Sequence, residues 1–493
     1  MKAVILKAKN GSDTCTVAGR FLHSAYNPER EAAQYVAKLT VDFVPRCILI
    51  IEPGLSYCAI ALRDRFPQAR LCCIRLTTDF SSYDVLWDTV FYASGAPQKD
   101  AEALYNSIGE ESLCALFAAA WAPSEQVFAS EVQTAWLSIK QAVLKGRDVL
   151  YTRAYFAKRW LKNTVRFAQQ LTHPALLQRA QCPIVIAASG TSLATSLPKL
   201  AEYRRHFFLI AASSALLPLL HAGIQPDIVI STDGGYWAKE HLRALAAHKE
   251  IALALAVEGA SPAQLLQAHT IIPLVYQDSI AVPLLTASNI PFMYAARNGT
   301  VSGTALQLAA AITTGDIFIC GLDLAASVGF QHTQPNALEA RACSFDMRLH
   351  TKETRAAIAQ YTSGSLAVYR DWFIAHAAAF KTRVFRLSNG FQYECKLGEL
   401  QDVDWQFFSK RLSASKQVFP TVSSEPNAMS RQALAKTLQQ ELSSGTWDSE
   451  LLPLESVLLR RTKNQTEAES LRATMQQARD ALITTLCAGG DNG

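Results

Sequence analysis

Small and polar residues follow several apolar stretches of the chain, and their types suit the binding of phosphates and sugars. Four such segments stand out: 188–192 (Ala-Ser-Gly-Thr-Ser), 231–235 (Ser-Thr-Asp-Gly-Gly), 298–302 (Asn-Gly-Thr-Val-Ser) and 321–324 (Gly-Leu-Asp-Leu). Glycine lets a backbone approach a phosphate closely, while hydroxyls and the N–H groups at a helix start can bind its oxygens. The first segment has neither the GxGxxG nor the GxxxxGK[ST] spacing, so a plain tight turn also explains it. Together the four segments predict one ligand crevice.

The side chains and turns of this crevice are candidates for contact with a nucleotide or sugar. The residues that we expect to bind there are Ser189, Gly190, Thr191, Ser192, Asp233, Asn298, Gly299, Thr300 and Gly321. Asp233 and Asp323 each end an apolar stretch. Such an aspartate either caps a helix or nearby loop amides, or contacts a ribose hydroxyl or the sugar. No carboxylate cluster has the spacing of metal ligands, so we infer no bound metal.

Three further features leave two interpretations open. His332, nine residues after Asp323 in a polar segment, is either a solvated loop residue or a general base at the crevice. Arg297 either neutralises a carboxylate or phosphate of the ligand or forms a surface ion pair. The segment 52–57 (Glu-Pro-Gly-Leu-Ser-Tyr) is either a second ligand turn or a structural corner between a strand and a helix.

The elements that must position these residues alternate between short apolar strands and helices. The expected strands of the central region are 184–187, 207–212, 228–231, 251–257, 271–275 and 317–320. We expect helices beginning near Pro198, where proline suits a first helical turn, and over 215–221 and 303–313. Continuous apolar strands between helices predict a parallel sheet covered on both faces, and ligands bind such sheets at the carboxyl ends of the strands.

A smaller α/β unit precedes this region, and helices follow it. The stretches 46–51, 57–66 and 70–75 read as strand, helix and strand, the skeleton of a βαβ unit. A chain of 493 residues is too long for one core. We expect an N-terminal α/β domain (1–130), a helical connector (131–180), a central Rossmann-like domain (181–400) and a C-terminal helical module (401–493).

Composition narrows the class of protein. Hydrophobic residues make up 49% and charged residues 18%, which suits a globular chain and not a disordered one. A net charge of +5 does not indicate a nucleic-acid binder, although it would help to hold an anionic ligand. The 11 cysteines form no CxxC pair and several lie in apolar runs, as expected in a reducing compartment. We find no signal peptide and no apolar stretch of membrane-spanning length, so we expect a cytoplasmic protein.

The order of these motifs resembles that of the motility-associated factor (Maf) flagellin glycosyltransferases, which share a domain with archaeal 6-hydroxymethylpterin diphosphokinases. Segment 186–193 (Ile-Ala-Ala-Ser-Gly-Thr-Ser-Leu) resembles the family's "VGAGPSL" loop. The similarity continues through 223–233, 298–309, 319–332 and the closing turn 387–391. This sequence departs from the family pattern at Ala188, Thr191 and Leu322, which puts an identical phosphate contact in doubt.

The resemblance implies a sialyltransferase-like central domain. It would transfer a nonulosonic sugar, such as pseudaminic or legionaminic acid, from a CMP-sugar donor to Ser or Thr of flagellin, a reaction needed for flagellar assembly and motility. Carried over to this sequence, Gly190, Thr191 and Ser192 would hold the nucleotide phosphate, and Asp233 and Asp323 would line the pocket. The expected catalytic residues are His332, as the base, and Asp323. No cofactor is required beyond the CMP-sugar, and the expected partner is flagellin.

Two other functions remain open. The shared domain also fits a pterin diphosphokinase, which would bind ATP with Mg²⁺ on carboxylates such as Asp233. The long flanking regions argue against that assignment, because a small kinase has no use for them. The altered loop residues Ala188 and Thr191 also leave room for a flagellin-binding protein without catalytic activity.

Overall fold

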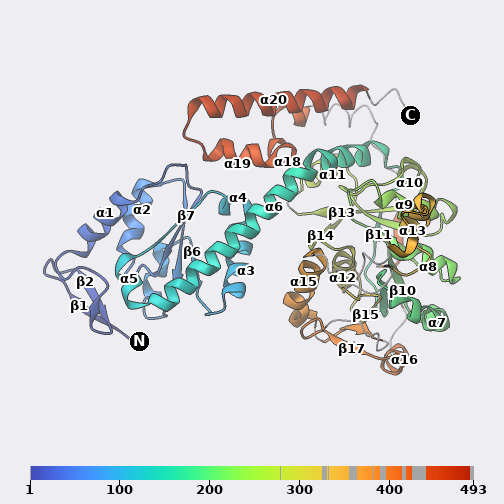
Figure 1. The fold of residues 1–493 in the computed structure, drawn as a ribbon, viewed down its shortest axis with the longest axis horizontal. Coiled ribbons are helices and arrows are strands. Elements are labelled where there is room, and N and C mark those ends of the chain that lie inside the picture. The colour runs from blue at the N-terminus through green and yellow to red at the C-terminus, as the bar shows by residue number, and fades with distance from the viewer. Residues whose placement is uncertain are drawn as a thin grey trace. The chain divides into compact units, whose positions relative to one another are not determined.

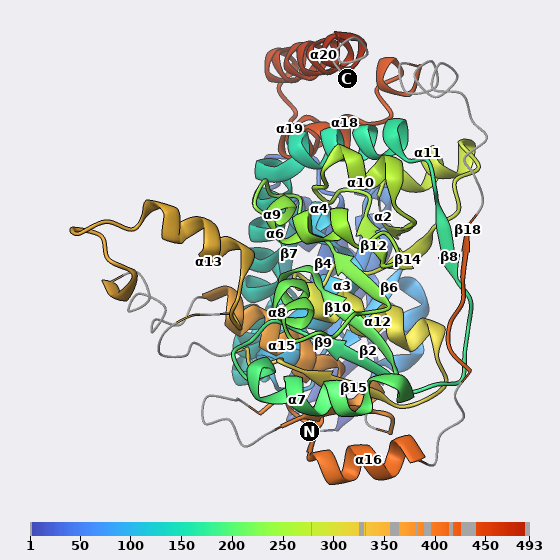
Figure 2. The same ribbon diagram turned by 90° about the vertical axis from the view of Figure 1, so that its right-hand side faces the viewer.

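The chain forms two compact units, each built around a parallel sheet. The computed structural model describes residues 2–277, 279–324, 330, 332–354, 364–380, 382–388, 396–413, 418–424 and 440–488. One unit comprises residues 1–158 with 441–493, and the other comprises residues 159–440 (Figures 1 and 2). The four predicted domains stay a prediction. The expected boundary at residue 400 falls between two paired strands of the second unit.

The second unit contains a nine-stranded sheet in the order β14-β13-β12-β11-β10-β9-β15-β16-β17, and every neighbouring pair is parallel. This arrangement confirms the predicted α/β class with a large central parallel sheet. The strands are β9 (Ile184–Ala187), β10 (Phe208–Ala212), β11 (Ile228–Ser231), β12 (Ala252–Ala256), β13 (Ile271–Tyr276), β14 (Met293–Ala295), β15 (Ile317–Cys320), β16 (Val384–Leu387) and β17 (Gln401–Val403). A separate antiparallel pair joins β8 (Ala175–Leu177) to β18 (Val422–Ser424).

Helices cover both faces of this sheet. Successive side chains of a strand point to opposite faces, so apolar strands give the sheet two apolar faces to bury. In β9, Val185 joins one hydrophobic core and Ile186 joins the other. The first core receives side chains from α7 (Leu193–Tyr203), α8 (Leu216–His221), α10 (Ala263–Ala268), α11 (Ala281–Ala287) and α16 (Trp405–Ser413). The second receives them from α12 (Val301–Ile312) and α15 (Gly364–Phe380). Both faces are buried, which explains the uninterrupted apolar strands.

One predicted helix start is wrong. The helix α7 begins at Leu193, and Pro198 lies inside it. The carboxylate of Asp323 accepts a hydrogen bond from the backbone N–H of Ser192, at the residue before the helix. This contact satisfies one of the donors that a helix start leaves without a partner. The start is therefore set by a residue distant in sequence, which a local proline rule cannot detect.

The first unit has a four-stranded parallel sheet in the order β6-β5-β4-β7. Its strands are β4 (Cys47–Ile51), β5 (Arg70–Arg75), β6 (Thr89–Tyr92) and β7 (Leu116–Ala120). The helices α1 (Pro28–Lys38) and α2 (Tyr57–Arg65) pack on one face, and α3 (Pro97–Ile108) and α6 (Ala129–Gln170) pack on the other. This confirms a smaller N-terminal α/β fold. The sequence did not indicate the additional antiparallel sheet of β1 (Ala3–Lys7), β2 (Asp13–Val17) and β3 (Arg20–Phe21).

Helices from the end of the chain complete the first unit. They are α18 (Asp448–Leu451), α19 (Pro453–Arg461) and α20 (Gln465–Ala488), in addition to the short helices α4 (Glu110–Leu113) and α5 (Ala122–Val127). Arg153 of α6 lies 2.5 Å from Glu110 and 3.1 Å from Glu450, so ion pairs join the early and late segments. Within the described residues, no helix is both long enough and apolar enough to cross a membrane.

Candidate active site

The strand order creates a topological switch point between β9 and β15. From β9 the chain adds strands on one side, from β10 to β14, and then returns to add β15, β16 and β17 on the other. In open parallel sheets a ligand crevice forms at such a point, outside the carboxyl ends of the strands. The segments 188–192 and 321–324 follow β9 and β15 directly, so the structure brings these two predicted segments together.

Asp323 connects the two strand ends. It is 5% exposed, and its carboxylate accepts hydrogen bonds from the Ser192 N–H (2.9 Å), the Ser192 hydroxyl and the Thr191 hydroxyl (3.2 Å). The N–H and hydroxyl groups that we expected to bind a phosphate therefore donate to a carboxylate of the protein instead. An anion bound by the same donors would have to displace Asp323. The phosphate role of this turn stays a prediction.

Two glycines make this close approach possible. A Cβ atom at Gly190 would lie 2.5 Å from the carbonyl oxygen of Gly321 and 2.6 Å from Asp323 Oδ2. Gly321 has a φ of +69°, and a Cβ atom there would overlap the carbonyl of Ala188. The Gly190 N–H donates to the Gly321 carbonyl at 2.9 Å. Both glycines therefore hold the two strand ends against each other.

His332 lies at the same strand ends. Its Nδ1 is 3.0 Å from the Oγ of Ser189, and Ser214 donates a 2.7 Å hydrogen bond to that Oγ. The next residue, Thr333, is tied to the turn by a 2.9 Å hydrogen bond from its N–H to the Ser189 carbonyl and by one from its hydroxyl to the Gly190 carbonyl. These contacts fix the imidazole at the crevice.

The surroundings of His332 favour its neutral form. Burial lowers the pKa of the His332 imidazole below its usual value, and a hydrogen bond with the Ser189 backbone carbonyl opposes this shift only in part. A neutral imidazole carries one lone pair that can accept a proton. In the tautomer whose Nδ1–H donates to Ser189 Oγ, the lone pair is on Nε2, which is then the nitrogen that remains for a reacting group.

A second histidine stands near this site, and sequence reasoning missed it. His241 lies on the short helix α9 (Ala238–Leu242), which follows β11 and its Asp233 loop. Burial and then the charge of His332 lower the pKa of His241 to about 4, while Asp233 raises it. The three groups are therefore electrostatic neighbours. The sequence feature that could have identified His241 is its place in the first helix after a predicted strand end.

Asp233 is an exposed residue whose Oδ1 accepts a 2.8 Å hydrogen bond from the Gly235 N–H. This is the loop-amide role that we considered for Asp233. Asn298 is buried, and its Oδ1 accepts hydrogen bonds from the Thr300 N–H and the Thr304 hydroxyl. It thus organises the start of α12.

The rest of that segment also packs internally. Gly299 has a φ of +74°, and a Cβ atom there would lie 3.3 Å from the ring of Tyr369. Arg297 forms a two-pronged ion pair with Glu258, at 2.9 and 2.8 Å, and its guanidinium lies 4.4 Å from the ring centre of Tyr276. Of the two interpretations of Arg297, the structure shows the ion pair.

The N-terminal turn at 52–57 is filled by its own side chains. Glu52 and Arg75 are fully buried and lie 3.1 Å apart, and the Glu52 carboxylate also accepts hydrogen bonds from the Gly54 and Leu76 N–H groups. Arg75 donates in addition to the Gly54 carbonyl and to the Ser56 hydroxyl. The turn is a satisfied corner between β4 and α2.

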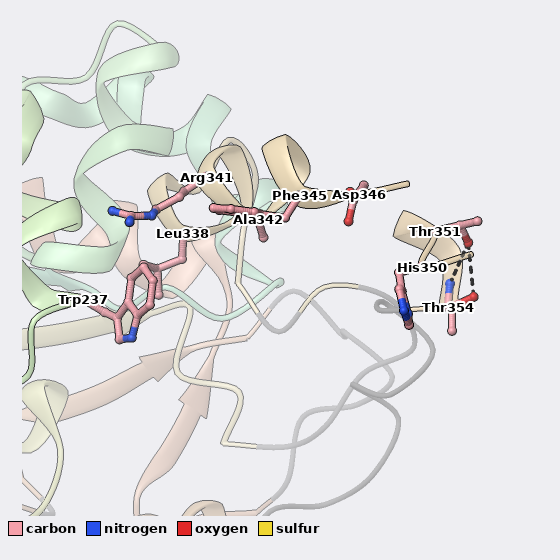
Figure 3. Close-up of a pocket in the computed structure, with 9 residues that line it drawn as sticks. All are labelled: Trp237, Leu338, Arg341, Ala342, Phe345, Asp346, His350, Thr351 and Thr354. Carbon is pink, nitrogen blue, oxygen red and sulfur yellow. Dashed lines mark hydrogen bonds between the residues drawn. The ribbon is translucent and has the colours of Figure 1, made fainter. Parts of the chain in front are cut away.

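A pocket of about 590 Å³ lies beside α13 (Ala337–Ala342). Figure 3 shows Trp237 and Leu338 on one side of it, and His350 and Thr351 on the other. Its walls are mainly apolar, and Arg341 at its rim is paired with Glu240 at 2.8 Å. Asn336 caps α13 and donates to the Ser214 carbonyl at 3.3 Å. The pocket wall is therefore connected to the residues around His332.

The described residues contain no group of three or more His, Cys, Asp or Glu side chains that could hold a metal ion.

The predicted family turn at 387–391 lies partly outside the described residues, since 389–391 are not among them. Nine cysteines of the described chain are free, and most are buried.

Comparisons with known proteins concern the fold and the central part of the chain. Residues 158–329 match the family model described as 6-hydroxymethylpterin diphosphokinase MptE-like. A protein of Treponema pallidum (strain Nichols) is 28% identical over 320 residues, which cover 64% of this chain and 69% of that protein. The solved structure of MAf glycosyltransferase from Magnetospirillum magneticum AMB-1 superposes with a TM-score of 0.53 at 12% identity, covering 99% of this chain and 91% of that chain. Residues 158–329 are therefore similar to the MptE-like domain, and the chain shares its fold with a Maf glycosyltransferase.

Proposed function

We propose that this chain is a glycosyltransferase that moves a nonulosonic sugar from a CMP-sugar donor to Ser or Thr of flagellin. The observation that carries the proposal is the placement of His332, whose Nδ1 is 3.0 Å from Ser189 Oγ at the switch point of the sheet. Support also comes from the fold shared with a Maf glycosyltransferase and from the order of motifs along the chain. A cytoplasmic location would suit a donor made inside the cell.

In the proposed reaction, an acceptor hydroxyl attacks the anomeric carbon of the sugar. A bond forms between that carbon and the acceptor oxygen, the bond to the donor phosphate breaks, and CMP leaves with the electron pair. The hydroxyl has a pKa far above 7, so a base must take its proton as the new bond forms. His332 Nε2 is the proposed base, and the neutral state favoured by burial suits that task.

The contacts around His332 would position it. Ser189 occupies Nδ1 and so directs Nε2 toward the reacting group, while Ser214 holds the Ser189 hydroxyl. We assign Asp323 the task of closing the turn that carries Ser189. Its catalytic contribution would then be the correct placement of that turn, and Asp233 would contact the sugar or ribose from the neighbouring strand end.

The pocket beside α13 is our candidate for the acceptor segment. Its volume of about 590 Å³ lies in the range of ligand pockets. Arg341 shares Glu240 with Arg243, at 2.8 and 2.9 Å, so the only charged side chain that it pairs with is itself held by two arginines. Its apolar walls, including Leu338 and Phe345, suit an apolar side chain next to the acceptor hydroxyl.

The test is intact-mass analysis of flagellin from cells that carry the wild-type gene, no gene, or the His332→Ala variant. We expect the sugar mass to be absent in the last two. His248→Ala is the matched control, because His248 is partly exposed and pairs with Glu250 in the turn before β12. Unchanged flagellin mass without the gene would overturn the function, and normal glycosylation by His332→Ala would overturn the role of that residue.

A second candidate is diphosphoryl transfer to a hydroxymethylpterin, which the family model over 158–329 favours. That reaction needs Mg²⁺ held by carboxylates. Incubation of the purified protein with ATP, Mg²⁺ and hydroxymethylpterin tests it directly. Formation of the pterin diphosphate would favour this function over the transferase.

A further inference from the structure

Three positive side chains gather on α6 and α9 of the second unit. Lys162 and Arg166 are four residues apart on α6 and therefore share one face of the helix. Lys239 lies on α9. Among the described residues, no acidic side chain forms an ion pair with any of the three, and Arg166 donates a 3.2 Å hydrogen bond to Gln170. Within that part of the chain, no carboxylate compensates this basic cluster.

The three charges are close enough to influence one another. Burial lowers the pKa of the Lys239 ammonium group, and the positive charges of Arg166 and Lys162 lower it further. Like charges repel, and partial burial weakens the screening by water and salt. A bound anion would relieve this repulsion.

The basic cluster is also held at the ligand-binding edge of the sheet. Asn163, next to Lys162, donates hydrogen bonds of 3.2 Å to the Gly234 carbonyl and 2.9 Å to the Glu258 carbonyl. These carbonyls belong to the loops that follow β11 and β12. The contact is tight, because a Cβ atom at Gly234 would lie 2.7 Å from the ring of Trp160. This part of α6 thus crosses the carboxyl ends of the strands, where ligands bind.

Among the described residues of the crevice at β9 and β15, the phosphate-binding donors already serve a carboxylate. The hydroxyls of Thr191 and Ser192 and the Ser192 N–H are given to the Asp323 carboxylate, which adds a negative charge there. Arg297 is paired with Glu258, whereas Arg341 and Arg243 share Glu240, so that second group keeps one net positive charge. The basic cluster carries three positive charges, so it offers a phosphate more positive charge than the group of Arg243, Glu240 and Arg341 does.

We propose that Lys162, Arg166 and Lys239 form an anion site that binds the phosphate of the nucleotide-activated sugar. This inference rests on the proposed transferase function and deepens it. The ring of Tyr236 is 53% exposed and lies 5.9 Å from the Lys239 ammonium group, so it offers a surface on which the nucleobase can stack. A ligand whose phosphate binds the basic cluster and whose nucleobase stacks on Tyr236 is a nucleotide.

The experiment measures binding of CMP to the full-length chain by isothermal titration calorimetry. The variants are Lys162→Gln, Arg166→Gln and the double variant, all exchanges of partly or fully exposed side chains that the core does not need. Lys249→Gln is the matched control, since Lys249 is an exposed lysine in the turn before β12. It therefore lies at the amino end of that strand, away from the carboxyl ends. We expect each single change to weaken CMP binding about tenfold, the double change to weaken it more, and the control to bind as the wild type does.

Two results would overturn the anion site: equal CMP affinity in the double variant and the wild type, or no CMP binding by the wild type. Inorganic phosphate serves as a second probe, and binding as tight as that of CMP would overturn the assignment to a nucleotide. The proposed transferase function fails separately. If CMP binding depends on the basic cluster while flagellin mass is the same with and without the gene, the anion site stands and the transferase does not.

Discussion

The carboxylate of Asp323 accepts a 2.9 Å hydrogen bond from the backbone N–H of Ser192, although 131 residues separate them along the chain. The contact joins the ends of β15 and β9 at the switch point of the sheet. It also sets the start of α7 and the turn that carries Ser189. One carboxylate thus supports the strand ends, a helix terminus and the placement of His332.

We expect Asp323→Asn to lower the free energy of unfolding by about 1–3 kcal/mol, because an amide presents an NH₂ group to donors that need an acceptor in a buried place. Urea denaturation of the full chain measures the change. Asp371→Asn is the control, since that side chain is 71% exposed and should shift stability by less than about 0.5 kcal/mol. Equal stability of the two variants would contradict the structural role of Asp323.

Gly190→Ala tests the close approach itself. The added Cβ would meet the Gly321 carbonyl and the Asp323 carboxylate, so the two strand ends must move apart. We expect loss of stability together with loss of transfer. Gly223→Ala is a useful comparison, because a Cβ atom there meets open space and only the φ of +71° is strained, at about 1 kcal/mol. If Gly190→Ala lowers the free energy of unfolding no more than Gly223→Ala does, the contact of Gly190 with Gly321 and Asp323 is looser than the distances indicate.

The acid limb of the pH–rate profile should report His332. The base must be neutral, so the rate falls as pH drops through its pKa, by about tenfold for each unit below it. Burial lowers that pKa, and the limb should therefore lie below the ordinary histidine value of 6.5. Single-turnover rates between pH 4 and 8 measure it. A limb above pH 6.5 would show that another group, or a differently placed His332, controls the rate.

The sheet could be predicted closely from the sequence because its strands are buried on both faces. The bounds of β9, β11 and β15 coincide with the predicted strands 184–187, 228–231 and 317–320. The antiparallel strand β1 escaped prediction because its residues do not alternate between buried and exposed, and Val4 and Ile5 are about half exposed. The three-residue strand β14 is too short to show a period.

The candidate site was predictable as a set of strand ends but not as a set of contacts. Pattern and strand polarity place Ser189 and Asp323 at one edge, yet only the strand order makes β9 and β15 neighbours. The pairing of Ser192 with Asp323 and the approach of His332 to Ser189 depend on that order. His241 was missed because its helix is short and its neighbours come from other segments.

The pocket beside α13 predicts a defect in acceptor binding. Trp237 is 52% exposed and lines the pocket, with the Arg341 guanidinium 4.7 Å from its ring centre. We expect Trp237→Ala to raise the KM for the acceptor several-fold with little change in kcat, since the side chain would contribute binding in both ground and transition states. Tyr294→Ala, an exposed aromatic change on the edge strand β14, is the control. A fall in kcat at constant KM would contradict a role of Trp237 in acceptor binding and would indicate a contact that forms only in the transition state.

The first unit should lose stability in acid through His23. This imidazole is 1% exposed, its Nε2 accepts a 2.9 Å hydrogen bond from the Leu55 N–H, and burial followed by the charge of Arg75 lowers its pKa to about 3. Above pH 6.5 the group is neutral in both the folded and unfolded chains, so its contribution is constant. Between pH 6.5 and about 3 only the unfolded chain binds the proton, so stability falls as pH falls, by up to about 1.4 kcal/mol per pH unit.

Urea unfolding of the wild type and His23→Gln at a series of pH values isolates this contribution. Every other titrating group is common to both proteins, so the difference between the two slopes belongs to position 23. We expect the variant to be less stable at pH 7, because glutamine differs in shape at a site where Gly54 already contacts the ring closely. Its stability should nevertheless fall less steeply toward pH 4. Parallel curves would mean that His23 is protonated in the folded chain, in conflict with its acceptance of the Leu55 hydrogen bond.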